Sequence, residues 1–402
     1  MKVIQINNVY AKGSTGKIIR DLHEGLLEKG VDSIVIYGRG QKSSDPRVIK
    51  VCSEFYAHIN KVWSFITGLM YGGCFFSTNR IIRIIKKEKP DIVHLQCING
   101  NFVNIYRLVT WLKKHNIKTV LTLHAEFMHT ANCGYALDCE KWKTGCGHCP
   151  RLKQETHSWL LDGTHRSWVK MKKAFDGFDT LQLVSCSDWL RNRSNQSPIL
   201  KELPNVTIYN GIRTGLFDFK IQPSDKDVLL KYGIPQGKKI ILHVTPSFFG
   251  EVKGGKYFRA LSELLPDEYQ CVVVGCANSN AHKILHIPYT NNQGELAALY
   301  RCASVFVITS KCDNYPTVCL EANCCGTPVV GFDVGGVKET IFPGMGDVVP
   351  FGNIALLKEE IKGYAGGKVD DEIIHDAIKR NGMDRMNNDY YALYVSIYLR
   401  SK

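Results

Sequence analysis

The sequence lacks several features that would assign the chain to a special class of protein. No apolar run approaches the ~18 residues that a membrane-spanning helix needs. The apolar start of the chain, MKVIQINNVY, is too short for a signal peptide and predicts a first strand. Without an export signal, the 15 cysteines are not expected to form a disulfide framework. We therefore expect a globular protein of the cytoplasm.

Nucleotide-binding signatures are also missing. The loop AKGSTGK (11–17) has neither the full G-x-G-x-x-G pattern nor the Walker pattern, so a nicotinamide or P-loop site is poorly supported. No recognised nucleic-acid motif with interleaved aromatic residues occurs. These absences disfavour dehydrogenases, P-loop enzymes and nucleic-acid-binding proteins.

Charge is present, but it is unevenly distributed. Residues 1–205 contain 30 lysines and arginines against 17 acidic residues, whereas residues 206–402 contain 21 of each. A basic half predicts an anionic partner, such as a nucleic acid, a phospholipid surface or a phosphorylated acceptor. A generally basic surface with no specific partner is the simpler alternative.

Both halves alternate short apolar runs with amphipathic stretches, which predicts an α/β fold with parallel sheets. At 402 residues, the chain is long enough for two domains. We predict Rossmann-like domains at 1–205 and 206–386 that face a central cleft, with a helix at 387–402 packing back on the first. Ligands of such sheets bind at the carboxyl ends of the strands, which directs attention to residues there.

In the first half, two kinds of residue follow predicted strands. Gly13 and Gly16 would let the backbone approach a phosphate or sugar closely, although a purely structural turn is the commoner reading. His94 and His124 end the runs DIVHLQ and TVLTLHA. Contact with sugar hydroxyls is predicted for His124 and, on the acceptor side, for His94; satisfied structural histidines are the alternative.

In the second half, SFFGEVKGG follows a strand and places Lys253 where it could hold a diphosphate, or lie solvated in a turn. Asp313 and Glu321 flank the start of a helix predicted between Pro316 and Gly326. Glu321 could grip the vicinal hydroxyls of a ribose, and Asp313 a hydroxyl of a transferable group. Further donor contacts are predicted at the residues between them and at the helix N-terminus: Asn314, Tyr315, Thr317 and Val318.

These motifs resemble retaining glycosyltransferases of family 4, which have the GT-B fold. The acidic-x7-acidic motif of that family is matched by Asp313 and Glu321, with Asp at a position where Glu is usual. YNGIRTGLF (209–217) is similar to its interdomain segment. LTLHA is similar to the strand whose histidine contacts the donor sugar, which implicates His124. The similarity covers nearly the whole chain.

The resemblance implies a UDP- or GDP-sugar donor bound by the second domain and a glycan acceptor, expected to be lipid-linked, bound by the first. It also implies transfer with retained configuration, without a catalytic metal, in the synthesis of a capsule, exopolysaccharide or O-antigen. The segment before Lys253 has no arginine, so the diphosphate charge is expected to rest on Lys253 and helix dipoles. An epimerase of the same fold is an alternative enzyme.

Two further segments stand apart from these motifs. CGYALDCEKWKTGCGHCP places Cys133, Cys139, Cys146 and Cys149 at spacings compatible with a structural zinc, with unligated thiols or a redox pair as alternatives. KVWSFITGLMYGGCFF (61–76) is apolar, and RIIRIIKKEKP (80–90) follows it. This pair predicts peripheral binding to the anionic inner face of the plasma membrane; a core helix beside a solvated one is the alternative.

Overall fold

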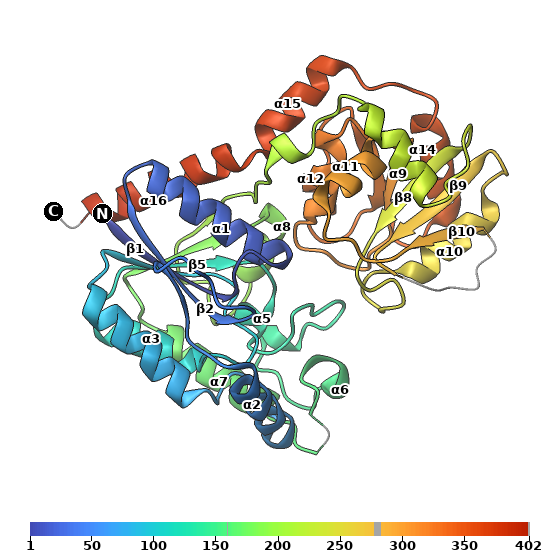
Figure 1. Cartoon of the computed structure of the whole chain (residues 1–402). Coiled ribbons are helices and arrows are strands. Elements are labelled where there is room, and N and C mark those ends of the chain that lie inside the picture. Colours follow the sequence, from blue (N-terminus) through green and yellow to red (C-terminus); the bar gives the residue numbers. More distant parts are fainter. Residues whose placement is uncertain (159, 277–282, 401–402) are drawn as a thin grey trace. The chain divides into compact units, whose positions relative to one another are not determined.

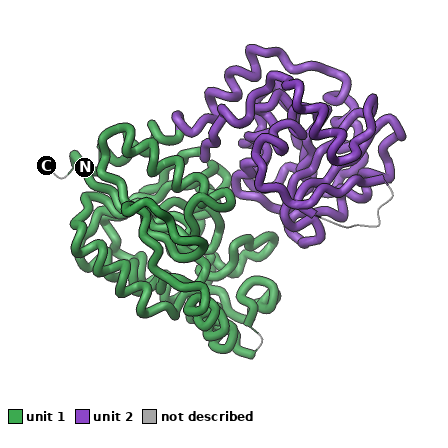
Figure 2. Tube along the Cα trace, in the orientation of Figure 1, with its two compact units in different colours: residues 1–209, 386–402 green, residues 210–385 purple. Residues whose placement is uncertain are grey.

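A computed structural model describes residues 1–158, 160–276 and 283–400 of the chain (Figure 1). These residues form two compact units. Unit 1 comprises Met1–Tyr209 and the C-terminal segment from Met386, and unit 2 comprises Asn210–Arg385 (Figure 2). The last two residues of the helix predicted at 387–402 lie outside the described residues.

Within its described residues, unit 1 is built on a seven-stranded parallel sheet in the order β3-β2-β1-β4-β5-β6-β7. The strands are β1 (Lys2–Val9), β2 (Asp32–Arg39), β3 (Val48–Lys50), β4 (Ile92–Leu95), β5 (Thr119–Leu123), β6 (Leu181–Ser185) and β7 (Asn205–Thr207). The helices are α1 (Gly13–Glu28), α2 (Glu54–Thr67), α3 (Phe75–Glu88), α4 (Ile105–Lys114), α5 (Phe127–Thr130), α6 (Leu152–Glu155), α7 (Thr164–Phe175) and α8 (Asp188–Ser194), with a 3-10 turn at Lys141–Lys143.

The C-terminal helix α16 (Met383–Leu399) brings the chain back to unit 1. Its buried residues Met386, Tyr390 and Tyr394 join one core cluster with apolar side chains of α1 and of strands β1, β4, β5 and β6. The Asn387 side chain donates a hydrogen bond to the carbonyl of Asp21 in α1, with a donor–acceptor distance of 3.2 Å. Helix α16 is therefore part of the covering of the first sheet.

The described part of unit 2 contains a six-stranded parallel sheet in the order β10-β9-β8-β11-β12-β13. Its strands are β8 (Lys239–Val244), β9 (Tyr269–Val274), β10 (Ile284–Ile287), β11 (Val305–Ile308), β12 (Val329–Phe332) and β13 (Gly346–Val349). Its helices are α9 (Pro223–Lys231), α10 (Gly255–Leu264), α11 (Gln293–Cys302), α12 (Thr317–Cys324), α13 (Val337–Thr340), α14 (Ile354–Tyr364) and α15 (Asp371–Asn381), with a 3-10 turn at Thr214–Leu216.

The central strands of both sheets are buried, as expected for parallel strands covered by helices on both faces. The prediction of two Rossmann-like parallel-sheet domains, the domain type of the GT-B fold, is confirmed. No helix among the described residues is long and apolar enough to cross a membrane. The 15 cysteines are free thiols in this structure.

Candidate active site

Lys253 and Asp313 meet at the carboxyl edge of the second sheet. Lys253 lies in the loop after β8 and Asp313 in the loop after β11, and these two strands pair directly in the sheet. The Lys253 Nζ donates to Asp313 Oδ2 over 2.6 Å, and both side chains are partly exposed. Sequence analysis predicted both residues as ligand contacts. The sheet brings them together across 60 positions of sequence.

The loop that carries Lys253 is held close to the sheet by two glycines. A Cβ atom on Gly254 would lie 1.8 Å from the carbonyl oxygen of Thr309, and one on Gly255 would lie 2.1 Å from that of Phe248. Any other residue there would force the backbone to move. The backbone N–H of Lys311 also donates to the carbonyl of Val252, which ties the two loops together.

Helix α12 begins and ends close to the predicted positions. Pro316 is its N-cap residue, and Gly326, with a φ of 77°, follows its C-cap. Thr317 and Val318 are half-buried in its first turn, where the partial positive charge of a helix is concentrated. Asn314 and Tyr315 are buried just before the helix. The helix therefore directs its N-terminus to the same edge of the sheet as Asp313.

Glu321 is buried within α12 rather than exposed on its surface. Its Oε2 accepts a hydrogen bond from the hydroxyl of the buried Tyr300, at 3.1 Å. Burial, together with the negative charge of Glu321, raises the pKa of Tyr300 well above its ordinary value, so the hydroxyl stays protonated and can donate. Tyr300 lies on α11, and sequence analysis had no signal that it would orient Glu321.

Additional cations lie beside the loop of Lys253. A cavity of about 220 Å³ is lined by that loop and by Lys256, Arg259 and Lys311. The Lys311 Nζ donates to Glu251 Oε1 at 2.8 Å, so one of these charges is already paired. Asp313 and Glu321 are not among the residues that line this cavity. Positive charge near the loop thus exceeds what sequence analysis expected when it assigned the diphosphate to Lys253 and helix dipoles.

In unit 1, His124 directly follows β5 and is half-buried. Its Nε2 lies 3.3 Å from Oε1 of Gln96, which follows β4. The Gln96 amide donates in turn to Gln5 of β1 at 2.9 Å. Burial lowers the pKa of His124 to about 4, so the ring is neutral at physiological pH. A neutral imidazole held at a strand end can exchange hydrogen bonds with a sugar hydroxyl.

His94, the other predicted histidine, lies inside the sheet. In the register of β4 with β5, His94 lies opposite Val120, which is four residues before His124. Its Nε2 lies 2.7 Å from Thr122 Oγ1, and its Nδ1 lies 2.7 Å from the Tyr394 hydroxyl. Both ring nitrogens therefore have protein partners, and burial lowers the pKa of His94 to about 3. This placement favours the structural role over the predicted acceptor contact.

Gly13 and Gly16 lie in the first turn of α1. Gly13 has a φ of 65°, and a Cβ atom there would have no neighbour within 4 Å. A Cβ atom on Gly16 would lie 3.1 Å from a methyl group of Val9 and 3.3 Å from the backbone nitrogen of Ala11. The absence of a side chain at Gly16 is thus explained by packing of α1 against β1. At Gly13 the positive φ, rather than crowding, favours glycine.

Sequence analysis missed a buried ion pair that follows His124 closely. Glu126 has no exposed surface, and its carboxylate accepts from Arg193 Nε and, at 2.5 Å, from the backbone N–H of Ala136. Its Oε1 also lies 3.3 Å from Nε2 of His129. Burial alone would raise the pKa of Glu126, but His129 and Arg193 lower it below its ordinary value. Since Arg193 lies 67 residues away, local sequence carries no signal of this contact.

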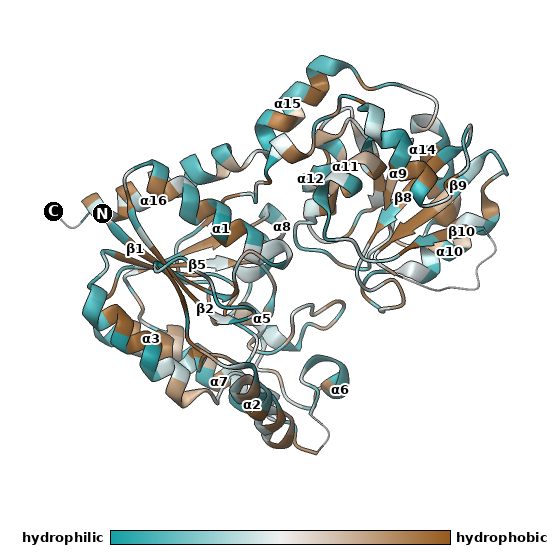
Figure 3. Ribbon diagram, in the orientation of Figure 1, coloured by the Kyte–Doolittle hydropathy of each residue, from teal (hydrophilic) through white to brown (hydrophobic). Residues whose placement is uncertain are grey.

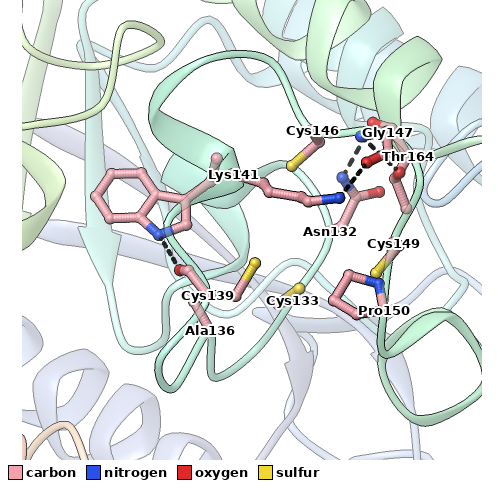
Figure 4. A pocket seen from close by; sticks show the side chains of 11 residues that line it. Asn132, Cys133, Ala136, Cys139, Lys141, Cys146, Gly147, Cys149, Pro150 and Thr164 are labelled. Atoms are coloured by element: carbon pink, nitrogen blue, oxygen red, sulfur yellow. Dashed lines mark hydrogen bonds between the residues drawn. The ribbon is translucent and has the colours of Figure 1, made fainter.

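The same arginine contacts the cysteine-rich loop of unit 1, residues 133–150. Its Nη2 donates to the carbonyl of Leu137 at 3.1 Å, and its guanidinium lies 5.1 Å from the ring centroid of Trp142. Figure 4 shows the four cysteine side chains around one pocket, which has a cavity of about 20 Å³. The residues in question are Cys133, Cys139, Cys146 and Cys149.

The C-x-x-C end of this loop has an unusual backbone. Cys146 and His148 both have positive φ values, of 51° and 47°. Lys141 Nζ donates to the carbonyls of Gly147 and His148, at 3.2 and 2.6 Å, and so supports the turn. Burial raises the pKa of Cys146 to about 12. As the side chains lie, no group of three or more His, Cys, Asp or Glu residues in the described chain is arranged to hold a metal ion.

Two family models match the chain. Residues 15–215 match the model described as "Glycosyltransferase Family 4", which is half of the sequence. Residues 230–365 match the model described as "Glycosyl transferases group 1". The first match lies in unit 1 except for its last six residues, 210–215. The second lies in unit 2 and includes Lys253, Asp313 and Glu321.

The chain is also similar to individual known proteins. A putative colanic acid biosynthesis glycosyl transferase, WcaC of Escherichia coli K12, is 23% identical over 377 residues, which cover 85% of each chain. Sucrose-phosphate synthase from Thermosynechococcus elongatus superposes with a TM-score of 0.68 at 15% identity, over 99% of each chain. HepE of Anabaena, solved in complex with UDP-glucose, has a TM-score of 0.66 at 14% identity, over 98% of this chain and all of that one.

Proposed function

Because the chain belongs to glycosyltransferase family 4, we propose that it transfers a sugar from a UDP- or GDP-sugar to a lipid-linked glycan acceptor in the synthesis of a surface polysaccharide, with retained configuration. The observation that carries this proposal is the grouping of Lys253, Asp313 and the start of α12 at one strand edge. A cation, a carboxylate and a helix N-terminus there suit a ligand with both phosphates and hydroxyls.

In this proposal unit 2 binds the donor. The Glu321 carboxylate accepts from the vicinal hydroxyls of the ribose, and Tyr300 keeps it in position. The ammonium of Lys253 exchanges part of its contact with Asp313 for the diphosphate, and Asp313 turns to a hydroxyl of the sugar. Lys256 and Arg259 add positive potential beside the loop. Asn314, Tyr315, Thr317 and Val318 line the turn that faces the donor.

The chemical step breaks the bond between the anomeric carbon and the diphosphate oxygen. The bonding electrons leave with the nucleoside diphosphate, whose growing charge is stabilised by Lys253 and the dipole of α12. The acceptor hydroxyl forms the new bond to the anomeric carbon, and its proton passes to the departing phosphate oxygen. We assign His124 to a hydroxyl of the sugar, because the family resemblance implies a sugar-contacting histidine there and its ring is neutral.

The proposed acceptor rests on two observations. Unit 1 carries most of the excess positive charge of the chain, which suits a phosphate-bearing lipid carrier. The relative from Escherichia coli K12 is named for the synthesis of colanic acid. An epimerase that uses the same donor is the second candidate, because the residues of unit 2 alone do not distinguish transfer from hydrolysis or epimerisation.

Thermal stabilisation by nucleotide sugars tests the donor proposal directly. Wild type, Glu321→Gln and the exposed control Glu359→Gln are compared with UDP-, GDP-, ADP- and CMP-linked sugars. We expect one donor to raise the Tm of wild type and of the control, and to have little effect on Glu321→Gln. Stabilisation of all three proteins alike would remove Glu321 from the donor site. Release of the free nucleotide without glycoside formation would favour the epimerase.

We also propose that the cysteine-rich loop binds a structural zinc. The donor set of four thiols around one pocket has the composition of a structural zinc site, but the sulfur atoms must turn towards one another to bind it. Metal analysis of protein purified without chelators tests this, with one zinc per chain expected. Cys149→Ser should lower the zinc content, and the control Cys276→Ser, at a half-buried cysteine of unit 2, should not. A metal-free wild type with native activity would overturn the proposal.

A further inference from the structure

Helix α2 exposes an apolar face to solvent, which is unusual for a surface helix of a globular protein. Five large apolar side chains lie along one stripe at helical spacing and face solvent: Phe55 (76% exposed), Ile59 (48%), Val62 (42%), Trp63 (54%) and Ile66 (53%). A surface helix ordinarily buries such a stripe and exposes its polar residues.

The buried face of the same helix is small and polar. Ala57, Asn60 and Ser64 face the interior of unit 1. The Asn60 side chain accepts from the backbone N–H of Cys74 at 2.6 Å, and the Ser64 hydroxyl donates to the carbonyl of Leu69 at 3.2 Å. These hydrogen bonds fix the orientation of α2, so the helix cannot rotate to bury its apolar stripe without losing them. In Figure 3, brown segments alternate with teal and pale ones along α2.

Two neighbouring segments extend the exposed apolar surface. At the start of α3, Phe75 and Phe76 are exposed, and the ring of Phe76 lies 5.9 Å from that of Tyr56 in α2. At the other end of α2, Leu160 and Leu161 are exposed. Ser158 anchors that loop, because its hydroxyl donates to the carbonyls of Phe65 and Leu161 at 3.0 and 2.7 Å. We call α2, the start of α3 and residues 160–161 the α2 surface.

Positive charge continues from this surface along α3. Phe76, Arg80, Arg83 and Lys87 recur at helical spacing and are all exposed. Between residues 54 and 89 there are six lysines and arginines and two acidic residues. Glu54 pairs with Arg39 and Lys50, and Glu88 pairs with Lys2 and, at 3.9 Å, with Lys87 of the same helix. Residues 54–89 thus carry four excess positive charges beside the apolar stripe.

The apolar stripe and the neighbouring positive charge together favour one kind of binding partner over the others. A second copy of the chain, docked symmetrically, would bring one basic stripe near the other, which is unfavourable. A nucleic acid would match the charge but leave Trp63, Ile66 and Leu160 in water. An anionic lipid surface accepts both parts, because apolar side chains enter the acyl boundary while cations contact the headgroups.

We propose that the α2 surface is the membrane-docking face of this protein, and that α2 lies in the plane of an anionic bilayer with its apolar stripe inserted. The inference deepens the proposed function, on which it rests for the lipid-linked acceptor, by naming the surface that brings unit 1 to that acceptor. Docking itself requires neither donor nor acceptor.

Co-sedimentation of the full chain with vesicles tests the proposal. Vesicles of phosphatidylcholine with 30 mol% phosphatidylglycerol are compared with pure phosphatidylcholine in the absence of substrates. We expect wild type to partition at least 10-fold more strongly to the anionic vesicles, and more weakly as salt concentration rises. Trp63→Ser/Ile66→Ser should lower partitioning to anionic vesicles at least 10-fold, and Arg80→Gln/Arg83→Gln should lower its dependence on phosphatidylglycerol.

Ile221→Ser/Leu230→Ser is the matched control, because both residues are exposed apolar side chains of unit 2 (76% and 61%). We expect it to bind vesicles as wild type does. Equal vesicle binding by wild type and Trp63→Ser/Ile66→Ser would overturn the proposal. A lower Tm of that variant without vesicles would also overturn it, because it would mean that other parts of the chain cover the stripe. A wild-type dimer that the same variant converts to a monomer would assign the surface to self-association instead.

A second readout locates the inserted residue. Bromine-labelled lipids quench tryptophans that enter the bilayer, so they should quench wild-type fluorescence more than that of Trp63→Phe. Equal quenching of the two proteins would exclude insertion at Trp63. Activity on a water-soluble acceptor is measured separately. If vesicle binding fails while that activity persists, the α2 surface is rejected and the proposed function stands; the reverse result rejects the proposed function alone.

Discussion

Ion pairs follow the carboxyl end of a strand in both units, but they differ in exposure. Lys253 and Asp313, after β8 and β11, form a partly exposed pair that a ligand can reach. Glu126, three residues beyond β5, forms a pair with Arg193 in which the carboxylate is fully buried. A partly exposed pair can trade its partner for a diphosphate at little cost, whereas a buried pair must stay intact. The pair beyond β8 and β11 is therefore open to exchange with a ligand, whereas the pair beyond β5 belongs to the scaffold of unit 1.

The largest effect is expected from breaking the buried pair. Glu126→Ala should lower the free energy of unfolding by about 3 to 5 kcal/mol, because Arg193 would be left without its buried partner. Urea denaturation followed by circular dichroism measures this. Glu140→Ala is the matched control, since Glu140 lies 3.5 Å from the same arginine but is exposed, and it should cost less than about 1 kcal/mol. Similar losses for both variants would contradict the comparison.

Removing the exposed pair should affect binding rather than stability. We expect Lys253→Met to weaken binding of the nucleoside diphosphate about 10- to 100-fold, or about 1.4 to 2.8 kcal/mol, while the free energy of unfolding changes by less than about 1 kcal/mol. Calorimetric titration with UDP and GDP gives the affinity. Lys239→Met, which removes an exposed pair with Glu268 in the same unit, should leave it unchanged. If Lys253 were purely structural, Lys253→Met would lower the free energy of unfolding and leave the affinity for the nucleoside diphosphate unchanged.

The two predicted histidines of unit 1 also differ in burial, so we expect His94 to affect stability and His124 to affect activity. Tyr394→Phe removes the hydroxyl that contacts the buried His94 and should cost about 1 to 2 kcal/mol of stability with no change in kcat. Tyr391→Phe, on the more exposed side of the same helix, should cost less. His124→Asn should instead lower kcat while the Tm stays near that of wild type. If Tyr394→Phe lowered kcat while the protein remained folded, the result would indicate that His94 contacts the substrate.

The smallest effect near neutral pH is a pH dependence of stability. Burial lowers the pKa of His94 to about 3 and that of His124 to about 4, whereas an unfolded histidine titrates near 6.5. Between these values the unfolded chain binds more protons, so stability is full above about pH 6.5 and falls as the pH falls. His94→Asn should reduce the slope of unfolding free energy against pH in that window, by up to about 1.4 kcal/mol per pH unit. An unchanged slope would mean that His94 titrates normally.

Local patterns predicted much of what the structure contains. Alternating apolar runs gave the two parallel sheets, and Pro316 and Gly326 marked the ends of α12 within two residues. The contacts between distant residues were beyond reach of those patterns. Nothing near Glu126 indicates Arg193, and nothing near Glu321 indicates Tyr300. His94 and His124 have the same apparent position in their strands, and only the register of β4 with β5 separates an interior residue from one at the edge.

By itself, the amino-acid sequence determined the class of the fold, the carboxylate spacing at Asp313 and Glu321, and the imbalance of charge between the two halves. These depend on neighbours along the chain, because periodicity, helix termini and composition are local quantities. Tertiary structure decided which charges are buried and which face of α2 meets solvent. An amphipathic pattern states that a helix has an apolar face, but the hydrogen bonds of Asn60 and Ser64 with residues outside the helix determine where that face points.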